Sequence, residues 1–389
     1  MIRKIVIASD SFKGSLTSQE VAEAAAEGVR RVLPECEATG VVIGDGGEGT
    51  AEAMATGDGW TRKIVTVHDP LGRCIEACYF MSEDGKALME MASASGLTLL
   101  KAEERNPLLT STYGTGEMML DAIRNGCRSI TIGIGGSATN DGGTGMLEAL
   151  GFRFMDRNGR QINGLCGARL SEIASICRND VARCIMDTEI TVACDVDSPF
   201  CGPDGATHVF ASQKGADSNA IRILEEGMKS LCDLIRETVG TDLADMAGAG
   251  AAGGLGGAFT SFLNARLTKG TDAVLDAIGF DGKLMDADIV ITGEGRIDAQ
   301  TGKGKTVSGI LERARRHGIP VIAIAGIVDM SEEEARERGF ASVLAIGPRP
   351  QNESDLENAM LPEVAKRRIS DTVAKALGSL SPSSCRESL

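Results

Sequence analysis

Residues 4–24 read KIVIASDSFKGSLTSQEVAEA, and the class of fold follows from this stretch. The continuous apolar run Ile5–Ile7 is typical of a strand that is buried on both faces, as in parallel sheets. Thr17 and Glu20 have the spacing of a capping box, which predicts that a helix begins directly after the strand and its loop. A second strand is expected at Gly40–Ile43. Strand, helix and strand in this order predict a βαβ unit.

The C-terminal third repeats the same pattern. Short apolar runs predict strands at 288–292, 321–325 and 341–346. Helical spacing of apolar residues predicts a helix at 305–317 and a final helix at about 357–377. Because each strand is followed by a helix, the two ends of the chain are expected to share one open, parallel sheet with helices on both faces.

The middle of the chain has a different pattern. Residues 61–85 alternate between polar and apolar side chains and contain turn signals, which is typical of antiparallel strands. We therefore predict an α/β fold with an open doubly wound parallel-sheet domain, Rossmann-like or flavodoxin-like, that is discontinuous and built from residues 1–65 plus 285–380. A mixed α/β domain is expected to be inserted at residues 66–284. The polar tail at 381–389 is expected to be disordered.

The composition excludes several classes of protein. The 389 residues include 40 Lys and Arg against 55 Asp and Glu, which gives a net charge of −15. A chain this acidic repels nucleic acids and anionic membrane surfaces, and no apolar stretch approaches the roughly 18 residues of a membrane span. The 11 cysteines are scattered without a CxxC pair, which favours a reducing, cytoplasmic location. The 49 glycines are an excess that indicates turns or ligand-binding loops.

Three polar loops are expected where ligands bind in open α/β sheets, outside the carboxyl ends of the strands. The first, Asp10–Ser15 (DSFKGS), combines a lysine, hydroxyls and backbone N–H groups before a helix, which suits a carboxylate or a phosphate. The second, Gly44–Thr50 (GDGGEGT), carries Asp45 and Glu48, which suit Mg²⁺ or a substrate hydroxyl. The third is Gly293–Asp298 (GEGRID).

The inserted domain contributes further loops. Residues 133–145 (GIGGSATNDGGTG) contain six glycines with neutral hydroxyl and amide donors, which suits a cradle for phosphate. The first six of these residues match the dinucleotide pattern GxGxxA, but a ribose-binding acid is lacking at the expected spacing. Asp195 and Asp197 follow a strand expected at 191–194, and one of the two can be catalytic while the other is structural. The segment 248–257 (GAGAAGGLGG) is consistent with a hinge or with a ligand loop.

The string IASDSFKGSLTSQEVAEA at residues 7–24 resembles the bacterial glycerate kinase family, which has a two-domain α/β fold. The resemblance continues in collinear order through DGGEGT at 45–50, GTGE at 114–117, GIGGSATNDGGTGML at 133–147, CDV at 194–196, GAAGGLG at 250–256 and TGEGRIDAQT at 292–301. It implies a kinase that uses ATP and Mg²⁺ to phosphorylate D-glycerate, with 2-phosphoglycerate and ADP as the expected products. The expected partners are these two small molecules, with no nucleic acid and no membrane; the oligomeric state stays open, a homodimer being one option.

Residue type and position assign each candidate a role in that reaction. Asp45 or Asp195 is expected to orient and deprotonate the attacking hydroxyl, with Lys13 as a further catalytic residue. The residues expected to bind the substrate are Asp10, Ser11, Lys13, Ser15 and Arg296. The residues expected to cradle the ATP phosphates are Gly135, Gly136, Ser137, Thr139, Asn140, Gly142 and Gly143. The residues expected to hold the metal, directly or through water, are Glu48, Asp141, Glu294 and Asp298.

Two other functions are alternatives to the kinase. A nicotinamide-dependent oxidoreductase acting on a hydroxy acid would use the GxGxxA stretch, although an obvious His or Lys base is missing. A small-anion sensor would bind the same ligand without turnover, although no segment for DNA reading or partner docking supports it. An assay with D-glycerate and Mg-ATP separates the three, because only the kinase releases ADP and phosphoglycerate.

Overall fold

The computed structural model describes residues 2–12, 14–43, 51, 59–178, 181–298 and 306–379. The chain divides into two compact units, Met1–Asp45 with Val274–Leu389, and Gly46–Ala273. We call them the terminal unit and the inserted unit. The boundaries between these units lie at 45/46 and 273/274, whereas the sequence led us to expect 65/66 and 284/285. The strand that begins at Trp60 therefore belongs to the inserted unit throughout.

The terminal unit contains a five-stranded, all-parallel sheet in the order β14-β13-β12-β1-β2. Its strands are β1 (Lys4–Ser9), β2 (Glu37–Val42), β12 (Ile289–Asp298), β13 (Val321–Asp329) and β14 (Ser342–Ala345). Its helices are α1 (Ser18–Val32), α11 (Phe280–Leu284), α12 (Thr306–Arg316), α13 (Glu332–Arg338), α14 (Glu353–Met360) and α15 (Pro362–Gly378). Counted within this unit, the strand order is 2-1-3-4-5, the flavodoxin-like order. The doubly wound class expected from the sequence is therefore confirmed.

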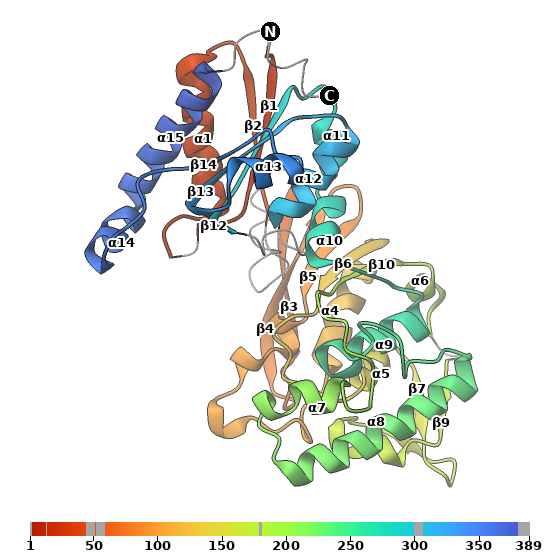
Figure 1. Ribbon diagram of the computed structural model, residues 1–389. Helices are drawn as coiled ribbons and strands as arrows, with labels where there is room; N and C mark the ends of the chain where they lie inside the picture. The colour runs from red at the N-terminus through yellow and green to blue at the C-terminus, as the bar shows by residue number, and fades with distance from the viewer. Residues whose placement is uncertain are drawn as a thin grey trace. The chain divides into compact units, whose positions relative to one another are not determined.

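Helices cover both faces of this sheet. Figure 1 shows α1 and α15 side by side on one face and α12 on the other. The face under α1 and α15 is an apolar core that includes Ile5, Ile7, Ile289, Ile291 and Ile324. The capping box expected at Thr17 and Glu20 is present at the start of α1. The strand order reverses between β1 and β12, because β2 is added on one side of β1 and β12 on the other. This position is the topological switch point at which such sheets bind ligands.

Two elements at the chain's end differ from expectation. The strand expected at 288–292 continues to Asp298, because its second half pairs with β13 as far as Asp298 and Asp329. The single final helix is two helices, which Leu361 separates with an extended ψ of 127°. The cause is Pro362, since the ring of a proline disfavours helical geometry in the residue before it.

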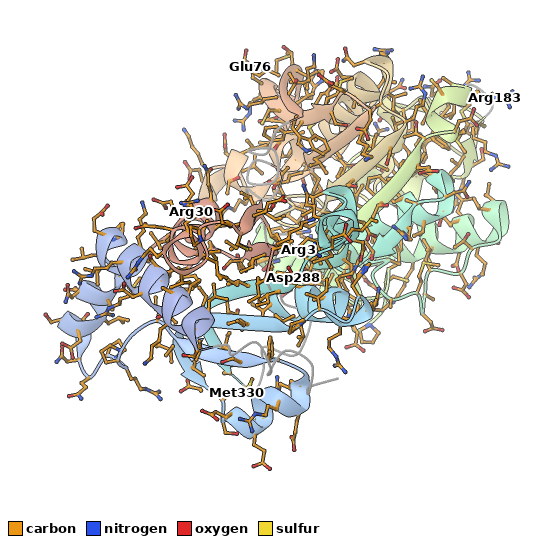
Figure 2. All side chains as sticks on the ribbon, turned by 90° about the horizontal axis from the view of Figure 1, so that it is seen from above. Arg3, Arg30, Glu76, Arg183, Asp288 and Met330 are labelled. Carbon is orange, nitrogen blue, oxygen red and sulfur yellow. The ribbon has the colours of Figure 1, made fainter. Side chains whose placement is uncertain are left out.

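The two ends of the chain are tied together at the amino ends of their strands. The Asp288 carboxylate oxygen Oδ2 accepts hydrogen bonds from the backbone N–H groups of Arg3 (2.6 Å) and Lys4 (3.0 Å). Figure 2 labels Arg3 and Asp288, which lie next to one another. A single carboxylate thus joins the start of β1 to the start of β12 and holds the two strands in register.

The inserted unit contains a six-stranded mixed sheet in the order β11-β10-β6-β5-β4-β3. Its strands are β3 (Trp60–His68), β4 (Cys74–Ser82), β5 (Lys86–Glu90), β6 (Ser129–Gly133), β10 (Glu189–Ala193) and β11 (Arg266–Thr268). The first three pair as antiparallel neighbours, as the alternation at 61–85 predicts, and β5, β6, β10 and β11 are parallel. The α-helices in the described part of this unit include α3 (Ala92–Ser95), α4 (Tyr113–Arg124), α5 (Thr144–Ala149), α6 (Arg183–Met186), α7 (Ala206–Phe210), α8 (Ser218–Val239) and α9 (Ala251–Leu263); α10 (Gly270–Ala277) contains the second boundary.

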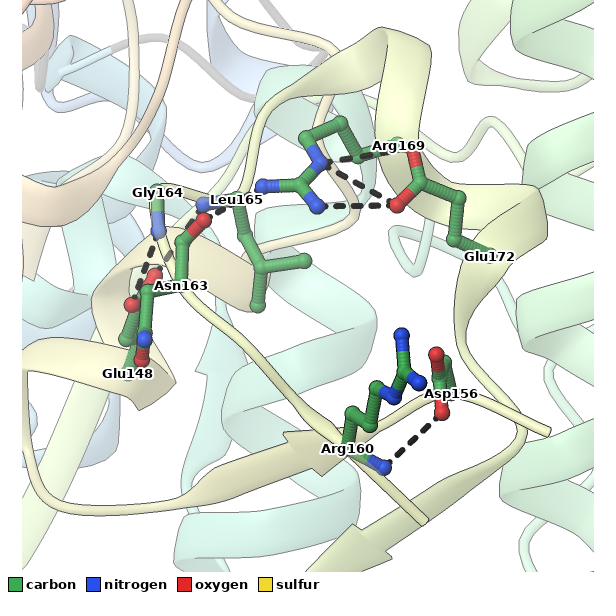
Figure 3. Close-up of polar contacts among 8 residues, drawn as sticks. All are labelled: Glu148, Asp156, Arg160, Asn163, Gly164, Leu165, Arg169 and Glu172. Atoms are coloured by element: carbon green, nitrogen blue, oxygen red, sulfur yellow. Dashed lines mark hydrogen bonds and ion pairs between the residues drawn. The ribbon is translucent and has the colours of Figure 1, made fainter. Parts of the chain in front are cut away.

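A small antiparallel sheet completes the inserted unit. It consists of β7 (Arg153–Met155), β8 (Gln161–Ile162) and β9 (Ser175–Cys177) in the order β8-β7-β9. Figure 3 shows how polar contacts hold the segments around it: Glu148 accepts from the N–H groups of Gly164 (3.0 Å) and Leu165 (3.1 Å). In the part of the chain that the structure describes, none of the helices has the length and apolar character needed to cross a bilayer.

Candidate active site

Asp10 follows β1 directly and lies at the switch point between β1 and β12. Its backbone N–H donates to the carbonyl of Gly293 (3.0 Å), and Ser9 Oγ donates to the same carbonyl (2.9 Å). The Asp10 carboxylate accepts from the Ser11 N–H at Oδ1 (2.6 Å) and from Thr306 Oγ1 at Oδ2 (3.2 Å). The half-buried carboxylate is therefore oriented at the carboxyl edge of the sheet, with Ser11 beside it.

The rest of the first loop is held against the end of α14. Ser15 Oγ donates to the carbonyl of Met360 (2.7 Å), so this hydroxyl is engaged within the protein. Gly14 has a φ of +80°, and a Cβ there would lie 2.7 Å from Met360 Cε. This geometry favours a structural role for Ser15 over the substrate-binding role expected from the sequence. Lys13 lies outside the described residues.

The expected third loop is a strand, and this changes how its residues are displayed. Because side chains alternate along a strand, Glu294, Arg296 and Asp298 lie on one face of β12, while Ile297 is fully buried on the other. A Cβ on Gly293 would lie 2.6 Å from the carbonyl of Ile324 on β13, so close strand packing explains that glycine. Three of the predicted site residues are thus presented together by one rigid element.

Arg296 is half-exposed and bound to acids on its own face. Its guanidinium forms an ion pair with Asp329, the last residue of β13, and its Nε lies 3.8 Å from Asp298 Oδ2. Asp298 and Asp329 are register partners across the two strands. Asp329 has no sequence motif of its own, and sequence reasoning missed it because only the pairing of β12 with β13 brings it to Arg296.

The Gly-rich loop after β6 is mostly inside the protein. Gly135 and Gly136 are exposed, whereas Ser137 is 8% exposed and Thr139 and Asn140 are completely buried. The loop is anchored by backbone hydrogen bonds to the segment after β5, among them Leu97 N–H to Gly136 O (2.8 Å). The backbone at the tip, Gly135 and Gly136, is therefore accessible to a phosphate. Ser137, Thr139 and Asn140, which the sequence predicted as phosphate donors, are buried and instead stabilise the conformation of the loop.

Asp141 is the centre of that buried part. It has no exposed surface, and its Oδ2 accepts from the N–H (2.7 Å) and Oγ1 (2.8 Å) of Thr112 and from the Gly145 N–H (3.3 Å). Its Oδ1 accepts from the Gly143 N–H (3.1 Å). Burial raises the pKa of Asp141, and these hydrogen bonds oppose the rise. Four internal donors favour a structural role over the metal-binding role expected from the sequence.

Lys214 is a second buried ionisable group next to this loop, and no sequence signal marked it. It is 2% exposed, and its Nζ donates to the carbonyl of Thr139 (2.7 Å). Burial lowers the pKa of Lys214 to about 7, which the negative charge of Asp141 opposes. A buried lysine thus fastens the middle of the Gly-rich loop through its backbone.

The second glycine-rich segment, for which hinge and ligand loop were both open, packs against the first. Ala252, Gly253 and Gly254 all have left-handed backbone angles at the start of α9. Gly142 N–H donates to Gly253 O (2.9 Å), and a Cβ on Gly253 would lie 2.1 Å from the carbonyl of Thr139. Here the glycines let two backbones approach one another, so close packing explains them.

Asp195 lies exposed after β10, on the carboxyl edge of the inserted unit's parallel strands. Its Oδ1 accepts from the Gly270 N–H at the start of α10 (2.8 Å), which fixes the direction of the carboxylate. Asp197 is also exposed, two residues further along the same loop. Of the two acids whose roles the sequence left open, Asp195 is therefore the one whose carboxylate a backbone hydrogen bond orients.

The dinucleotide alternative requires a helix that begins at the glycines. In that fingerprint the pyrophosphate lies at the N-terminus of a helix that the Gly-rich turn opens. Here β6 ends at Gly133, and the next helix, α5, begins at Thr144 and has six residues. Residues 133–138 therefore match the sequence pattern GxGxxA but do not have the strand–turn–helix geometry of a dinucleotide site.

Some predicted site residues belong to segments beyond those that the structure describes. Asp45, Glu48 and Lys13 lie outside the described residues, as does the tail at 381–389. Among the residues that are described, no group of three or more His, Cys, Asp or Glu side chains is arranged to hold a metal ion. Mg²⁺ is commonly bound by one or two carboxylates together with water and substrate phosphates, and Glu294 or Asp298 alone would fit that smaller donor set, since the two lie about 13 Å apart along β12.

The fold and site define a two-unit α/β protein whose terminal unit presents an oriented carboxylate at a flavodoxin-like switch point. Residues 5–380 match the model of the glycerate kinase family. The chain is 46% identical to the glycerate kinase of Halalkalibacterium halodurans over 89% of this chain and 91% of that protein. It is 42% identical to the glycerate 2-kinase of Escherichia coli K12 over 88% of this chain and 90% of that protein.

A solved structure shows the same similarity in three dimensions. The crystal structure of a candidate glycerate kinase 2 from Salmonella typhimurium LT2 superimposes with a TM-score of 0.85 at 40% identity, over 97% of this chain and 99% of that one. The chain belongs to the glycerate kinase family. The resemblance found in the sequence motifs is thereby confirmed.

Proposed function

We propose that this protein is an ATP-dependent glycerate kinase that transfers a phosphoryl group to the 2-hydroxyl of D-glycerate, giving 2-phosphoglycerate and ADP. The observation that carries the proposal is the Asp10 carboxylate, oriented by Ser11 and Thr306 at the switch point of a family member's terminal unit. Phosphoryl transfer depends on positioning and charge neutralisation more than on covalent chemistry, and preoriented polar groups supply both.

The hydroxy acid is assigned to the terminal unit. Asp10 and Ser11 can accept from and donate to the hydroxyls of glycerate, because both lie at the ligand-binding edge of the sheet. Lys13 and Arg296 supply the positive charge that a carboxylate needs. Ser15 is assigned to holding the loop through Met360.

The phosphates of ATP are assigned to the loop after β6. The backbone N–H groups at Gly135 and Gly136 are at the exposed tip, and a Cβ on Gly135 would meet nothing within 4 Å, so a phosphate can approach the backbone there. The other residues expected at this site from the sequence keep that tip in place from inside, namely Ser137, Thr139, Asn140, Gly142 and Gly143.

Mg²⁺ is assigned to Glu294 or Asp298, with Glu48 as a further candidate. When bound, the ion would neutralise charge on the transferring phosphoryl group. The two carboxylates lie four residues apart on one face of β12, about 13 Å along the strand, so either one can bind the ion, directly or through water, together with substrate phosphates.

The proton of the attacking hydroxyl is assigned to a carboxylate, Asp195 or Asp45. Asp195 has an orientation fixed by the Gly270 N–H, which general-base catalysis requires. In reaction, the base accepts the hydroxyl proton, the hydroxyl oxygen forms a bond to the γ-phosphorus, and the bond from that phosphorus to the β–γ bridging oxygen breaks.

A cytoplasmic location is part of the proposal. The cysteines that the structure describes are all free thiols, as in a reducing compartment.

A coupled assay tests the function directly. Purified protein, D-glycerate and Mg-ATP should produce ADP and 2-phosphoglycerate, with the position of the phosphate read by ³¹P NMR. Omission of glycerate should abolish ADP release. Turnover of NAD(P)H instead would favour the oxidoreductase, and ligand binding without any product would favour the sensor.

A further inference from the structure

Three parallel strands place two arginines around one carboxylate at the carboxyl edge of the terminal unit. Arg296 lies on β12, Asp329 ends β13, and Arg349 follows β14 by four residues. We call these three residues the arginine cluster. Figure 2 labels Met330, the residue directly after Asp329, and so marks this end of β13.

The cluster lies on a two-stranded extension of the sheet. The pairing of β1 with β12 ends at Ile291, whereas β12 and β13 continue together to Asp298 and Asp329. The extension therefore stands beyond the neighbouring strand at the edge where open α/β sheets bind ligands.

Each oxygen of the Asp329 carboxylate meets a different arginine. Oδ2 accepts from Arg296 Nη2, and Oδ1 accepts from Arg349 Nη1 at 2.8 Å. A guanidinium has five N–H donors, so the bond to Asp329, together with the ion pair of Arg296 Nε with Asp298 (3.8 Å), leaves further donors of each arginine for other acceptors. Asp329 therefore holds the two guanidinium groups close together while some of their N–H donors remain available for a ligand.

Exposure shows that the stability of the fold does not explain this arrangement. The side chains of Arg296 and Arg349 are 58% and 70% exposed, and that of Asp329 is 21% exposed. Ion pairs that are this exposed contribute little to stability, because water screens both charges. Arginine is, however, the side chain best suited to bind carboxylates and phosphates through two parallel hydrogen bonds.

We propose that Arg296 and Arg349 together bind one oxyanion group of a substrate, with Asp329 holding the two guanidinium groups in place. The inference rests on the proposed function and adds Arg349 and Asp329 to its binding residues. The shared chemistry is an oxyanion, either the carboxylate of glycerate or a phosphate of ATP. Asp329 orients the arginines but also repels the incoming anion, so its charge and the charge of Arg349 should act in opposite directions.

Binding measurements on the full-length protein test this without requiring turnover. Calorimetric titrations with inorganic phosphate, D-glycerate and ATP would be made for the wild type and for Arg349→Met and Asp329→Asn. Arg349→Met should weaken binding of the relevant anion about tenfold or more, since a charge-assisted hydrogen bond is lost. Asp329→Asn should strengthen it, because the repelling charge is removed while one carbonyl oxygen still accepts from an arginine.

A matched control separates this effect from the general loss of a surface ion pair. Arg31 pairs with Asp371 at 2.7 Å with exposures of 50% and 56%, so Arg31→Met removes a comparable pair and should leave all three affinities unchanged. Loss confined to glycerate assigns the carboxylate, and loss of phosphate and ATP binding assigns the phosphate. Unchanged affinities in Arg349→Met, or weaker binding in both cluster variants, would overturn the inference.

The test also separates failure of this inference from failure of the proposed function. If the wild type does not phosphorylate glycerate but Arg349→Met still loses anion binding, the arginine site stands and the reaction is wrong. If the wild type is an active kinase and Arg349→Met retains its affinities, the reaction stands and the arginine site is wrong.

Discussion

Thr306 donates a hydrogen bond from Oγ1 to Asp10 Oδ2 at 3.2 Å, across 296 positions of sequence. Thr306 begins α12 and is 2% exposed, so its hydroxyl has a fixed direction. The contact joins the N-terminal loop to the C-terminal helix and orients the carboxylate at the switch point.

Replacement of Thr306 should therefore impair substrate use more than folding. Thr306→Val keeps the shape but removes the donor, and we expect kcat/KM for glycerate to fall about tenfold, as for loss of a hydrogen bond to a charged group. The free energy of unfolding in urea should fall by no more than about 1.5 kcal/mol. Thr306→Ser restores the hydroxyl and should recover most of kcat/KM. A Thr306→Val enzyme with normal kcat/KM would remove this contact from the site.

The buried lysine predicts an unusual pH dependence of stability. Lys214 has a pKa of about 7 in the fold against an ordinary value of 10.5. Between these values the unfolded chain binds more protons at this position than the folded protein, so the free energy of unfolding should rise with pH from about 7 to about 10.5. This contribution is fully present above the unfolded pKa and is lost as the pH falls through the folded pKa. Its slope cannot exceed about 1.4 kcal/mol per pH unit.

Lys214→Met provides the comparison for that prediction. The variant removes the titrating group but keeps an unbranched side chain in the same space, so the rise between pH 7 and 10.5 should flatten in urea unfolding curves. The groups that face the amine are the Thr139 carbonyl and the Asp141 carboxylate, so Asp141 contributes its own dependence at lower pH. Equal slopes in wild type and variant would show that Lys214 does not titrate in this range.

Two glycines of the same loop should respond differently to alanine. Gly135 is exposed, and a Cβ there meets nothing within 4 Å, so Gly135→Ala should change stability by less than about 0.5 kcal/mol. If its backbone cradles phosphate, KM for ATP should rise severalfold. Gly142 has a φ of +61°, and a Cβ there would lie 2.5 Å from Leu231 Cδ2, so Gly142→Ala should destabilise the protein by about 1–3 kcal/mol.

The measurements for this pair are KM for ATP and the midpoint of thermal unfolding. A rise in KM without a loss of stability at Gly135, beside a loss of stability at Gly142, would support a phosphate-binding tip on a packed base. Gly135→Ala with an unchanged KM for ATP would place the phosphates elsewhere.

Asp195 and Asp45 compete for the role of general base. If Asp195 deprotonates the hydroxyl, Asp195→Asn should lower kcat at least about 100-fold, the low end for such catalysis. Asp197→Asn is the matched control, because Asp197 is an exposed acid in the same loop. Near-normal kcat in Asp195→Asn, together with a large loss in Asp45→Asn, would transfer the role to Asp45.

Much of the fold could be predicted because it depends on local pattern. The apolar run at Ile5–Ile7 and the capping box at Thr17 and Glu20 produced the expected strand and helix. The β12 strand was longer than expected because its second half is polar and glycine-rich, and its extended form depends on pairing with β13. Such long-range pairing leaves no periodic signal within the strand itself.

The sequence predicted the positions of several site residues better than it predicted their roles. Asp10 and Asp195 do lie at carboxyl edges of parallel strands, as loop position implied, whereas Arg296 lies on the extended part of β12 and not in a loop. Asp141 and Ser15 were expected to meet ligands, but their polar atoms are occupied by Thr112 and Met360 within the protein. Residue type shows that a group can bind a ligand, whereas burial determines whether a ligand can reach it.

The sequence by itself determined the family, the parallel doubly wound class and the segments that carry the candidate chemistry, because these follow from contiguous motifs and local hydrophobic periodicity. Only the tertiary structure decided which glycines face solvent and which pack backbone against backbone, as Gly142 and Gly253 do. It alone brought Thr306 to Asp10, and Arg349 with Arg296 to Asp329. The physical reason is that burial and hydrogen-bond partners are set by residues far apart in the chain, and no local pattern of side chains records them.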